Sequence, residues 1–179
     1  MSHRPIGKVK QGPAACLPYD TRAPEVARMV ARMIHHHLPH VIVEHVGSTA
    51  VPGCAGKGVI NLLIPYREGE LERVKDTLQD LGFQRQSTRD PFPEDRPMRV
   101  GSIIFDGDTF SLHVHVVPAS SDEPDELRAF RDSLRADREM LEAYVRRKRK
   151  IIEGGTTDAI DYSILKGAFV QEALEEIRR

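Results

Sequence analysis

The sequence predicts an α/β (α+β) fold in which helices flank a mixed β-sheet and two helices follow at the C-terminal end. Segments with apolar residues three and four positions apart, typical of helices, alternate with short apolar runs typical of strands. Turn-forming residues separate these segments, and after residue 117 the pattern is helical. This order of elements fits a sheet covered by helices.

The composition is that of an ordinary globular protein. The 179 residues are 40% hydrophobic and 30% charged, enough for one domain, which we assign to residues 18–179 after an N-terminal arm over 1–17. The net charge of −1 provides no field toward nucleic acid or membranes, and no run approaches the ~20 apolar residues of a membrane helix. The basic run over 146–150 contains no aromatic residue, which favours a solvated helix face. We expect a cytoplasmic protein with neither membrane nor nucleic acid as a partner.

Four segments carry the helical pattern. They cover residues 23–38, 69–81, 123–152 and 157–177. Pro24 suits the first turn of the first helix, Gly82 suits the end of the second, and Thr157 is a plausible N-cap for the last.

The strand signals surround one loop and one hairpin. Apolar runs over 41–43 and 59–64 enclose a loop of small residues, 47–53. A short strand is expected over 83–87, and the segment 89–97 is a candidate mobile flap. Two longer strands, 100–105 and 110–117, are joined by a hairpin turn over residues 106–108.

The 47–53 segment, called here the Gly-Ser loop, is the first candidate site. Gly47 suits a positive φ or a close approach of the backbone to a ligand. Ser48 and Thr49 add hydroxyl donors, and Lys57 lies at the start of the following strand. The alternative is a tight turn between two core strands. The clustering of small residues with Lys57 favours a loop that binds an anion.

Two histidines on the last strand are the second candidate. His113 and His115 are two residues apart, so they project from the same face of the strand, opposite the apolar side chains. Either they are half-exposed histidines on a sheet surface, or they form the wall of a site that binds a metal or phosphate.

These residues carry a resemblance to a known family. The segment 45–53 followed by Lys57 resembles the signature of the GrpB family, which belongs to the nucleotidyltransferase-like superfamily. Weaker matches follow in the right order from about Pro18 to the C-terminus. They are the segments 18–20, 112–117, 130–135 and 166–169, and Lys148.

The resemblance implies a nucleotidyltransferase-like fold whose Gly-Ser loop holds phosphate groups. In active members of that superfamily, carboxylates on two strands bind divalent metal, which neutralises phosphate charge. The residues of this chain that the resemblance and the strand pattern assign to the phosphate pocket are Gly47, Ser48, Thr49, Lys57, His113, His115, Arg131, Lys148 and Lys166.

The sequence departs from the superfamily at the metal site. Asn61 stands where the family usually has aspartate, and His113 and His115 stand where a carboxylate is expected. One hypothesis is a module that binds a nucleotide or another phosphate-bearing small molecule and has a degenerate metal site. The other is a metal-dependent nucleotidyltransferase in which Asn61, His113 and His115 bind magnesium, manganese or zinc.

Overall fold

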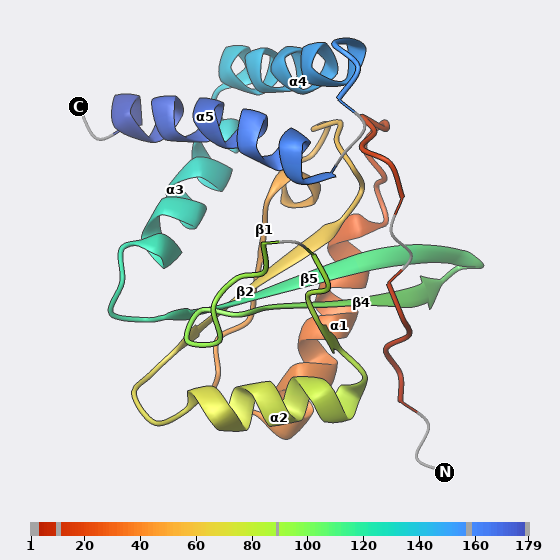
Figure 1. Ribbon diagram of the computed structural model, residues 1–179, viewed down its shortest axis with the longest axis vertical. Coiled ribbons are helices and arrows are strands. Elements are labelled where there is room, and N and C mark those ends of the chain that lie inside the picture. Colours follow the sequence, from red (N-terminus) through yellow and green to blue (C-terminus); the bar gives the residue numbers. More distant parts are fainter. Residues whose placement is uncertain (1–3, 10–11, 89, 157–158, 178–179) are drawn as a thin grey trace.

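The protein is built on one five-stranded mixed sheet (Figure 1). The computed structural model describes residues 4–9, 12–88, 90–156 and 159–177. Its strands are β1 (Glu44–Val46), β2 (Ile60–Tyr66), β3 (Gln84–Arg85), β4 (Met98–Phe105) and β5 (Asp108–Pro118). They lie in the order β1-β2-β5-β4-β3, with β2 and β5 parallel and every other pair antiparallel. The predicted mixed sheet is confirmed.

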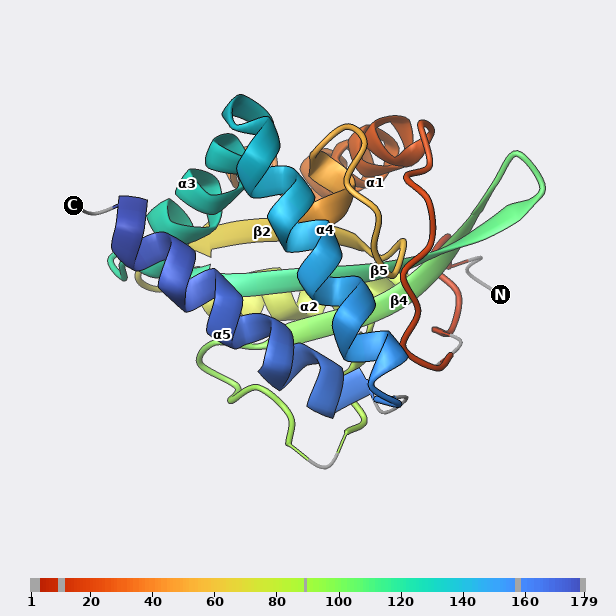
Figure 2. The same cartoon turned by 90° about the horizontal axis from the view of Figure 1, so that it is seen from above.

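Helices cover both faces of this sheet. They are α1 (Ala23–His37), α2 (Leu71–Leu81), α3 (Glu123–Ala136), α4 (Arg138–Glu153) and α5 (Ala159–Ile177), and a single 3-10 turn spans Ser48–Ala50. The helix α2 lies below the sheet in Figure 1, and α4 and α5 lie above it. Figure 2 shows α4 and α5 crossing the strands on that side. The sheet thus forms the middle layer.

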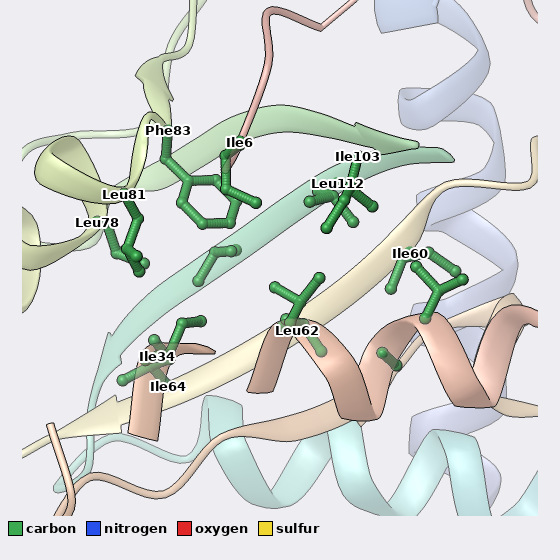
Figure 3. Packing of buried hydrophobic residues seen from close by; sticks show 14 of the residues in the cluster. Ile6, Ile34, Ile60, Leu62, Ile64, Leu78, Leu81, Phe83, Ile103 and Leu112 are labelled. Carbon is green, nitrogen blue, oxygen red and sulfur yellow. The ribbon is translucent and has the colours of Figure 1, made fainter. Parts of the chain in front are cut away.

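The main core lies between the sheet and the helices α1 and α2 (Figure 3). The buried strand residues that contribute to it are Ile60, Leu62 and Ile64 of β2, Ile103 of β4, and Phe110, Leu112, Val114 and Val116 of β5. Because strand side chains alternate between faces, Asn61, His113 and His115 project toward the α4 and α5 side. The predicted alternation in β5 is confirmed.

The expectation of one long helix over 123–152 is wrong. Residue Asp137 has extended backbone dihedrals, φ −118° and ψ 107°, and it separates α3 from α4. Its side chain accepts a hydrogen bond of 3.0 Å from the backbone amide of Met140, so Asp137 is the N-cap of α4. Within the described residues, three helices rather than two therefore follow β5.

The strand expected over 41–43 is also displaced. The Val41 amide donates to the Leu38 carbonyl in a turn after α1, and Ile42 is 52% exposed. The strand itself begins at Glu44 and pairs antiparallel with β2. The remaining strands and helices agree with the sequence to within a few residues, but the proposed N-cap Thr157 lies outside the described residues.

The hairpin and the N-terminal arm complete the sheet. The turn between β4 and β5 has positive φ at Asp106 and Gly107, 50° and 80°, which confirms the hairpin prediction. In the arm, Gly7 pairs with Ser102 of β4 and Leu17 pairs with Gly56. No helix in the described part of the chain is long and apolar enough to span a bilayer.

Candidate functional site

The Gly-Ser loop begins with a close approach to β2. Gly47 has a φ of 74°, as the sequence predicts. A Cβ atom at this position would lie 3.1 Å from the Nδ2 atom of Asn61. A larger residue would therefore be strained and would push the Asn61 amide away. Glycine is required here because the loop lies directly against the strand.

Asn61 is held by a hydrogen bond at each end of its amide. Its Nδ2 atom donates to the Val59 carbonyl at 3.1 Å, and its Oδ1 atom lies 3.2 Å from Nε2 of His115. Because the amide oxygen only accepts, His115 donates from Nε2. Gly47, Asn61 and His115 thus form one contiguous group across the loop, β2 and β5.

The same carbonyl connects Asn61 to His45. The Thr49 hydroxyl donates to Val59 O at 3.2 Å, so it accepts from Nε2 of His45 at 2.9 Å. A continuous chain of hydrogen bonds therefore runs from His45 through Thr49 and Val59 to Asn61 and His115. Thr49 is only 7% exposed, and its hydroxyl is used within this chain.

His45 is neutral at physiological pH. Burial, and with it the positive charges of Arg135, Arg131 and Arg28, lowers its pKa to about 4. Since Nε2 carries the proton that Thr49 accepts, Nδ1 of the neutral ring is an acceptor.

Lys148 lies beneath the Gly-Ser loop. The side chain is 1% exposed, although it belongs to the basic run over 146–150. Its Nζ atom donates to Ser48 Oγ at 3.1 Å and to Cys54 Sγ at 3.4 Å, and it also contacts the Ala55 carbonyl oxygen. The ammonium lies 4.2 Å from the centroid of the Tyr144 ring. Burial lowers the Lys148 pKa.

Lys57, like Lys148, has its ammonium group over a tyrosine ring. Its Nζ atom is 5.5 Å from the centroid of the Tyr162 ring, which belongs to α5 and is buried. Burial raises the pKa values of both Tyr144 and Tyr162, so both phenols are neutral. Lys148 thus lies over the ring of Tyr144 in α4, and Lys57 lies over the ring of Tyr162 in α5.

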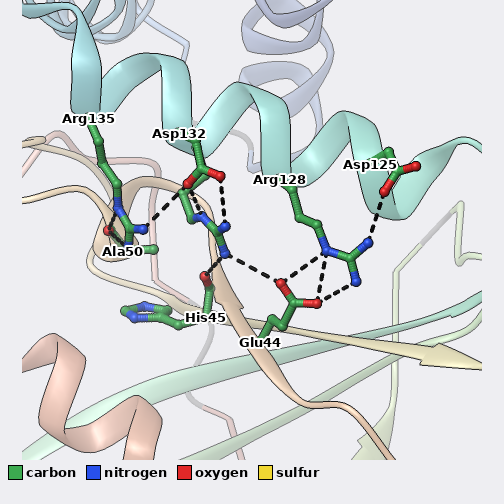
Figure 4. Close-up of polar contacts among 8 residues, drawn as sticks. Glu44, His45, Ala50, Asp125, Arg128, Asp132 and Arg135 are labelled. Atoms are coloured by element: carbon green, nitrogen blue, oxygen red, sulfur yellow. Dashed lines mark hydrogen bonds and ion pairs between the residues drawn. The ribbon is translucent and has the colours of Figure 1, made fainter.

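Arg131 belongs to an arginine row that joins α3 to β1 and the Gly-Ser loop (Figure 4). Arg128 donates to Glu44 at 2.9 Å, and Arg131 donates to the His45 carbonyl at 3.1 Å. Arg135 donates to the Ala50 carbonyl through two nitrogens, at 2.9 and 2.7 Å. Arg131 therefore supports the strand before the loop from the α3 side.

Two predicted site residues, His113 and Lys166, and the predicted metal site are still to be placed. His113 is paired in register with Asn61 and is half-buried. Lys166 belongs to α5, but its side chain lies outside the described residues. No group of three or more His, Cys, Asp and Glu side chains in the described part is arranged to hold a metal. Asn61 and His115, whose side chains contact each other, could give a metal at most two ligands, namely the neutral amide oxygen and one ring nitrogen.

Sequence reasoning missed Phe92, which covers this face. Its ring meets the His115 ring edge to face, with centroids 5.9 Å apart, and Arg96 stacks 4.6 Å above the Phe92 centroid. Arg96 is paired with Glu123 of α3. Aromatic residues in a proline-rich loop carry no periodic signal, so only the fold reveals this contact.

The chain resembles proteins from several bacteria. A model of the GrpB protein family matches residues 13–176. A UPF0157 protein of Halalkalibacterium halodurans is 30% identical over 95% of this chain and 86% of its own length. A UPF0157 protein of Streptomyces coelicolor is 31% identical over 83% of this chain and 75% of its own length.

A solved structure of a GrpB protein shows the same fold. The crystal structure of conserved protein GrpB from Enterococcus faecalis superposes with a TM-score of 0.69 at 21% identity, over 92% of this chain and all of that one. A weaker match, with a TM-score of 0.49 at 10% identity, is to the Cid1 poly(U) polymerase, over 74% of this chain and 45% of that one. A match at this score supports no conclusion about this chain. On the extent of the family-model match, the chain belongs to the GrpB family.

Proposed function

We propose that the protein binds a nucleotide or another phosphate-bearing small molecule at the Gly-Ser loop, as a binding or regulatory module with a degenerate metal site. The observation that carries this proposal is the buried ammonium of Lys148 beneath Ser48. In the described part of the chain, Lys148 has no carboxylate among its contacts.

A buried ammonium without a counterion is unfavourable, because its neutral partners replace only part of its hydration. A phosphate group at the loop would supply the missing negative charge and raise the Lys148 pKa again. Ser48 accepts a hydrogen bond from Lys148, which makes its hydroxyl a better donor to such a group. Lys57, which precedes β2, and His115 of β5 extend the polar surface.

The degenerate metal site follows from the hydrogen bonds of Asn61. Magnesium prefers several oxygen ligands, including carboxylates. The Asn61 oxygen carries no net charge and already accepts from His115. Binding of phosphate by hydrogen bonds and lysine charge therefore agrees better with these residues than two-metal catalysis does.

The alternative is a metal-dependent nucleotidyltransferase that uses His113 and His115 in place of carboxylates. One observation favours it. Asn61 is the register partner of His113 and contacts His115, so the three side chains belong to neighbouring positions on one face of the sheet. Imidazole ligands would favour zinc or manganese over magnesium.

Thermal unfolding with a ligand panel tests the proposal. The panel contains ATP, GTP, coenzyme A and inorganic tripolyphosphate, each in EDTA and again with magnesium, manganese or zinc. A ligand at a hundredfold excess over its dissociation constant should stabilise the fold by about 2.7 kcal/mol. We expect stabilisation in EDTA by at least one of them and no nucleotide transfer in a radiolabel assay. Absence of any shift would refute phosphate binding, and clear turnover with a metal would establish the alternative.

A further inference from the structure

We propose that a hollow of about 500 Å³ beside His45 is a second binding site, which takes a small organic hydroxycarboxylate with an apolar body. The hollow lies between the α3–α4 corner and the side of the Gly-Ser loop formed by Ala50 and Pro52. Its lining contains neither Ser48 nor Lys148, so it is separate from the proposed phosphate pocket. Its volume is in the range of small-molecule sites.

Most of the lining is apolar. Pro24 at the start of α1, Leu134 of α3 and Leu141 of α4 form this part of the wall. Such a surface stabilises a hydrocarbon or aromatic body by removing it from water. The polar groups come from three side chains, namely His45, Arg135 and Arg138.

The two arginines provide positive charge at the mouth of the hollow. Arg138 is 90% exposed, and within the described residues its contact is from Nε to Glu142 at 3.0 Å. Its two terminal nitrogens therefore remain available for a carboxylate. Arg135 uses Nε and Nη2 on the Ala50 carbonyl, and its Nη1 lies 3.4 Å from Asp132.

The pKa of His45 also indicates positive charge around the hollow. Besides burial, the groups that lower the His45 pKa are the guanidinium groups of Arg135, Arg131 and Arg28. An anion at the hollow thus enters a positive region even though Asp132 and Glu142 pair with two of the surrounding arginines.

His45 also selects the kind of anion. Its Nε2–H is donated to Thr49, so Nδ1 offers a lone pair. That lone pair repels the dianion of a phosphate monoester, which has no proton to donate, but it accepts from a hydroxyl group. A carboxylate held by Arg138 with a neighbouring hydroxyl directed at His45 satisfies both groups, and the apolar body then contacts Leu134 and Leu141.

The test is an NMR titration of the full chain at about pH 8, observing the imidazole nitrogens of His45, with mandelate, phenyllactate and phenyl phosphate as probes; at this pH the phosphate monoester is a dianion. We expect mandelate or phenyllactate to shift the His45 Nδ1 resonance with a millimolar dissociation constant, and phenyl phosphate to leave it unchanged. Arg138→Gln should weaken the binding about tenfold, since it removes a charged hydrogen-bond donor. The matched control is Arg146→Gln, because Arg146 lies on the same helix and pairs with the same Glu142, at 3.9 Å.

The site is refuted if neither hydroxycarboxylate shifts the His45 resonance, if phenyl phosphate shifts it equally, or if the two arginine variants weaken binding to the same degree. Leu141→Ala provides an independent variant that keeps every charge, and it should weaken phenyllactate binding by removing apolar contact. Ser48→Ala should leave the hydroxycarboxylate affinity unchanged. The outcome is therefore independent of whether the Gly-Ser loop binds phosphate.

Discussion

At the residue scale, Asn61 decides between the two proposed functions, because both ends of its amide are already in use. The nitrogen donates to the Val59 carbonyl and the oxygen accepts from His115. An aspartate at this position could accept from His115 but could not donate to Val59. It would instead place a carboxylate beside a carbonyl oxygen.

We predict that Asn61→Asp destabilises the metal-free protein by about 1 kcal/mol, the usual net effect of losing one hydrogen bond, here a partly buried one, measured by urea unfolding in EDTA. The added charge should also weaken nucleotide binding in EDTA, because it repels the phosphates. If the protein is instead a metal-dependent nucleotidyltransferase, the same variant should bind magnesium more tightly and turn over faster. A gain of activity with magnesium would contradict the binding module.

The second prediction at the residue scale concerns His45 and the dependence of folding stability on pH. Its folded pKa of about 4 lies below the ordinary 6.5, so the unfolded chain binds a proton more readily than the folded one. Stability from this residue is present above pH 6.5 and is lost as the pH falls toward 4. The loss amounts to about 3 kcal/mol.

His45→Gln removes this titration and retains a donor for Thr49. The wild-type protein should therefore lose more unfolding free energy than His45→Gln between pH 6.5 and 4, as measured by urea denaturation at several pH values. His40→Gln, at an exposed histidine, is the control. Parallel pH profiles for the wild type and His45→Gln would show that His45 is not held neutral.

At the scale of elements, the loop between β3 and β4 is anchored at several points. Arg99 donates to both Glu94 oxygens, at 3.1 and 2.8 Å, and the Tyr66 hydroxyl donates to the Asp95 carbonyl at 2.7 Å. Hydrogen bonds from Arg99 hold the Glu94 pKa at about 2. These contacts hold Phe92 over His115, so the segment expected to be a mobile flap is anchored to the sheet.

We predict that Glu94→Gln accelerates amide hydrogen exchange over residues 90–97 without changing exchange in β2 and β5. The substitution removes the charge that Arg99 and Lys75 bind, and local opening needs little disruption of the core. Asp90→Asn, in the same loop, serves as the control. Unchanged exchange over 90–97 in Glu94→Gln would mean that other contacts hold the loop.

At the scale of the whole molecule, the sequence predicts features that local periodicity encodes. The alternation in 110–117, the turn at Gly107 and the positive φ of Gly47 all follow from residue type and spacing. The sequence also contains a signal for the helix break, because Asp137 is a residue type that favours the N-cap position. The apolar spacing, however, continues across Asp137. The apolar spacing alone therefore does not predict the corner between α3 and α4, which forms part of the hollow beside His45.

Other features depend on contacts between distant segments. Lys148 is buried and its neighbours Arg147 and Arg149 are exposed. The residue types of the basic run do not distinguish them, and Lys148 is assigned to the pocket by the family resemblance alone. The pairing of Arg135 with Ala50 and the covering of His115 by Phe92 likewise join segments far apart in the chain. The sequence predicts which residue types gather near the loop, and only the fold reveals their partners.

The most direct test of the central claim compares Lys148→Met with Lys150→Met, two lysines of α4 of which the first is buried and the second exposed. Isothermal titration in EDTA measures the affinity of each for the phosphate compound that gave the largest thermal shift, with Ser48→Ala as a second variant should Lys148→Met fail to fold. We predict that Lys148→Met weakens binding about tenfold or more and that Lys150→Met changes it little. Equal affinity in the wild type and both lysine variants would contradict the claim that the buried ammonium beneath Ser48 binds phosphate.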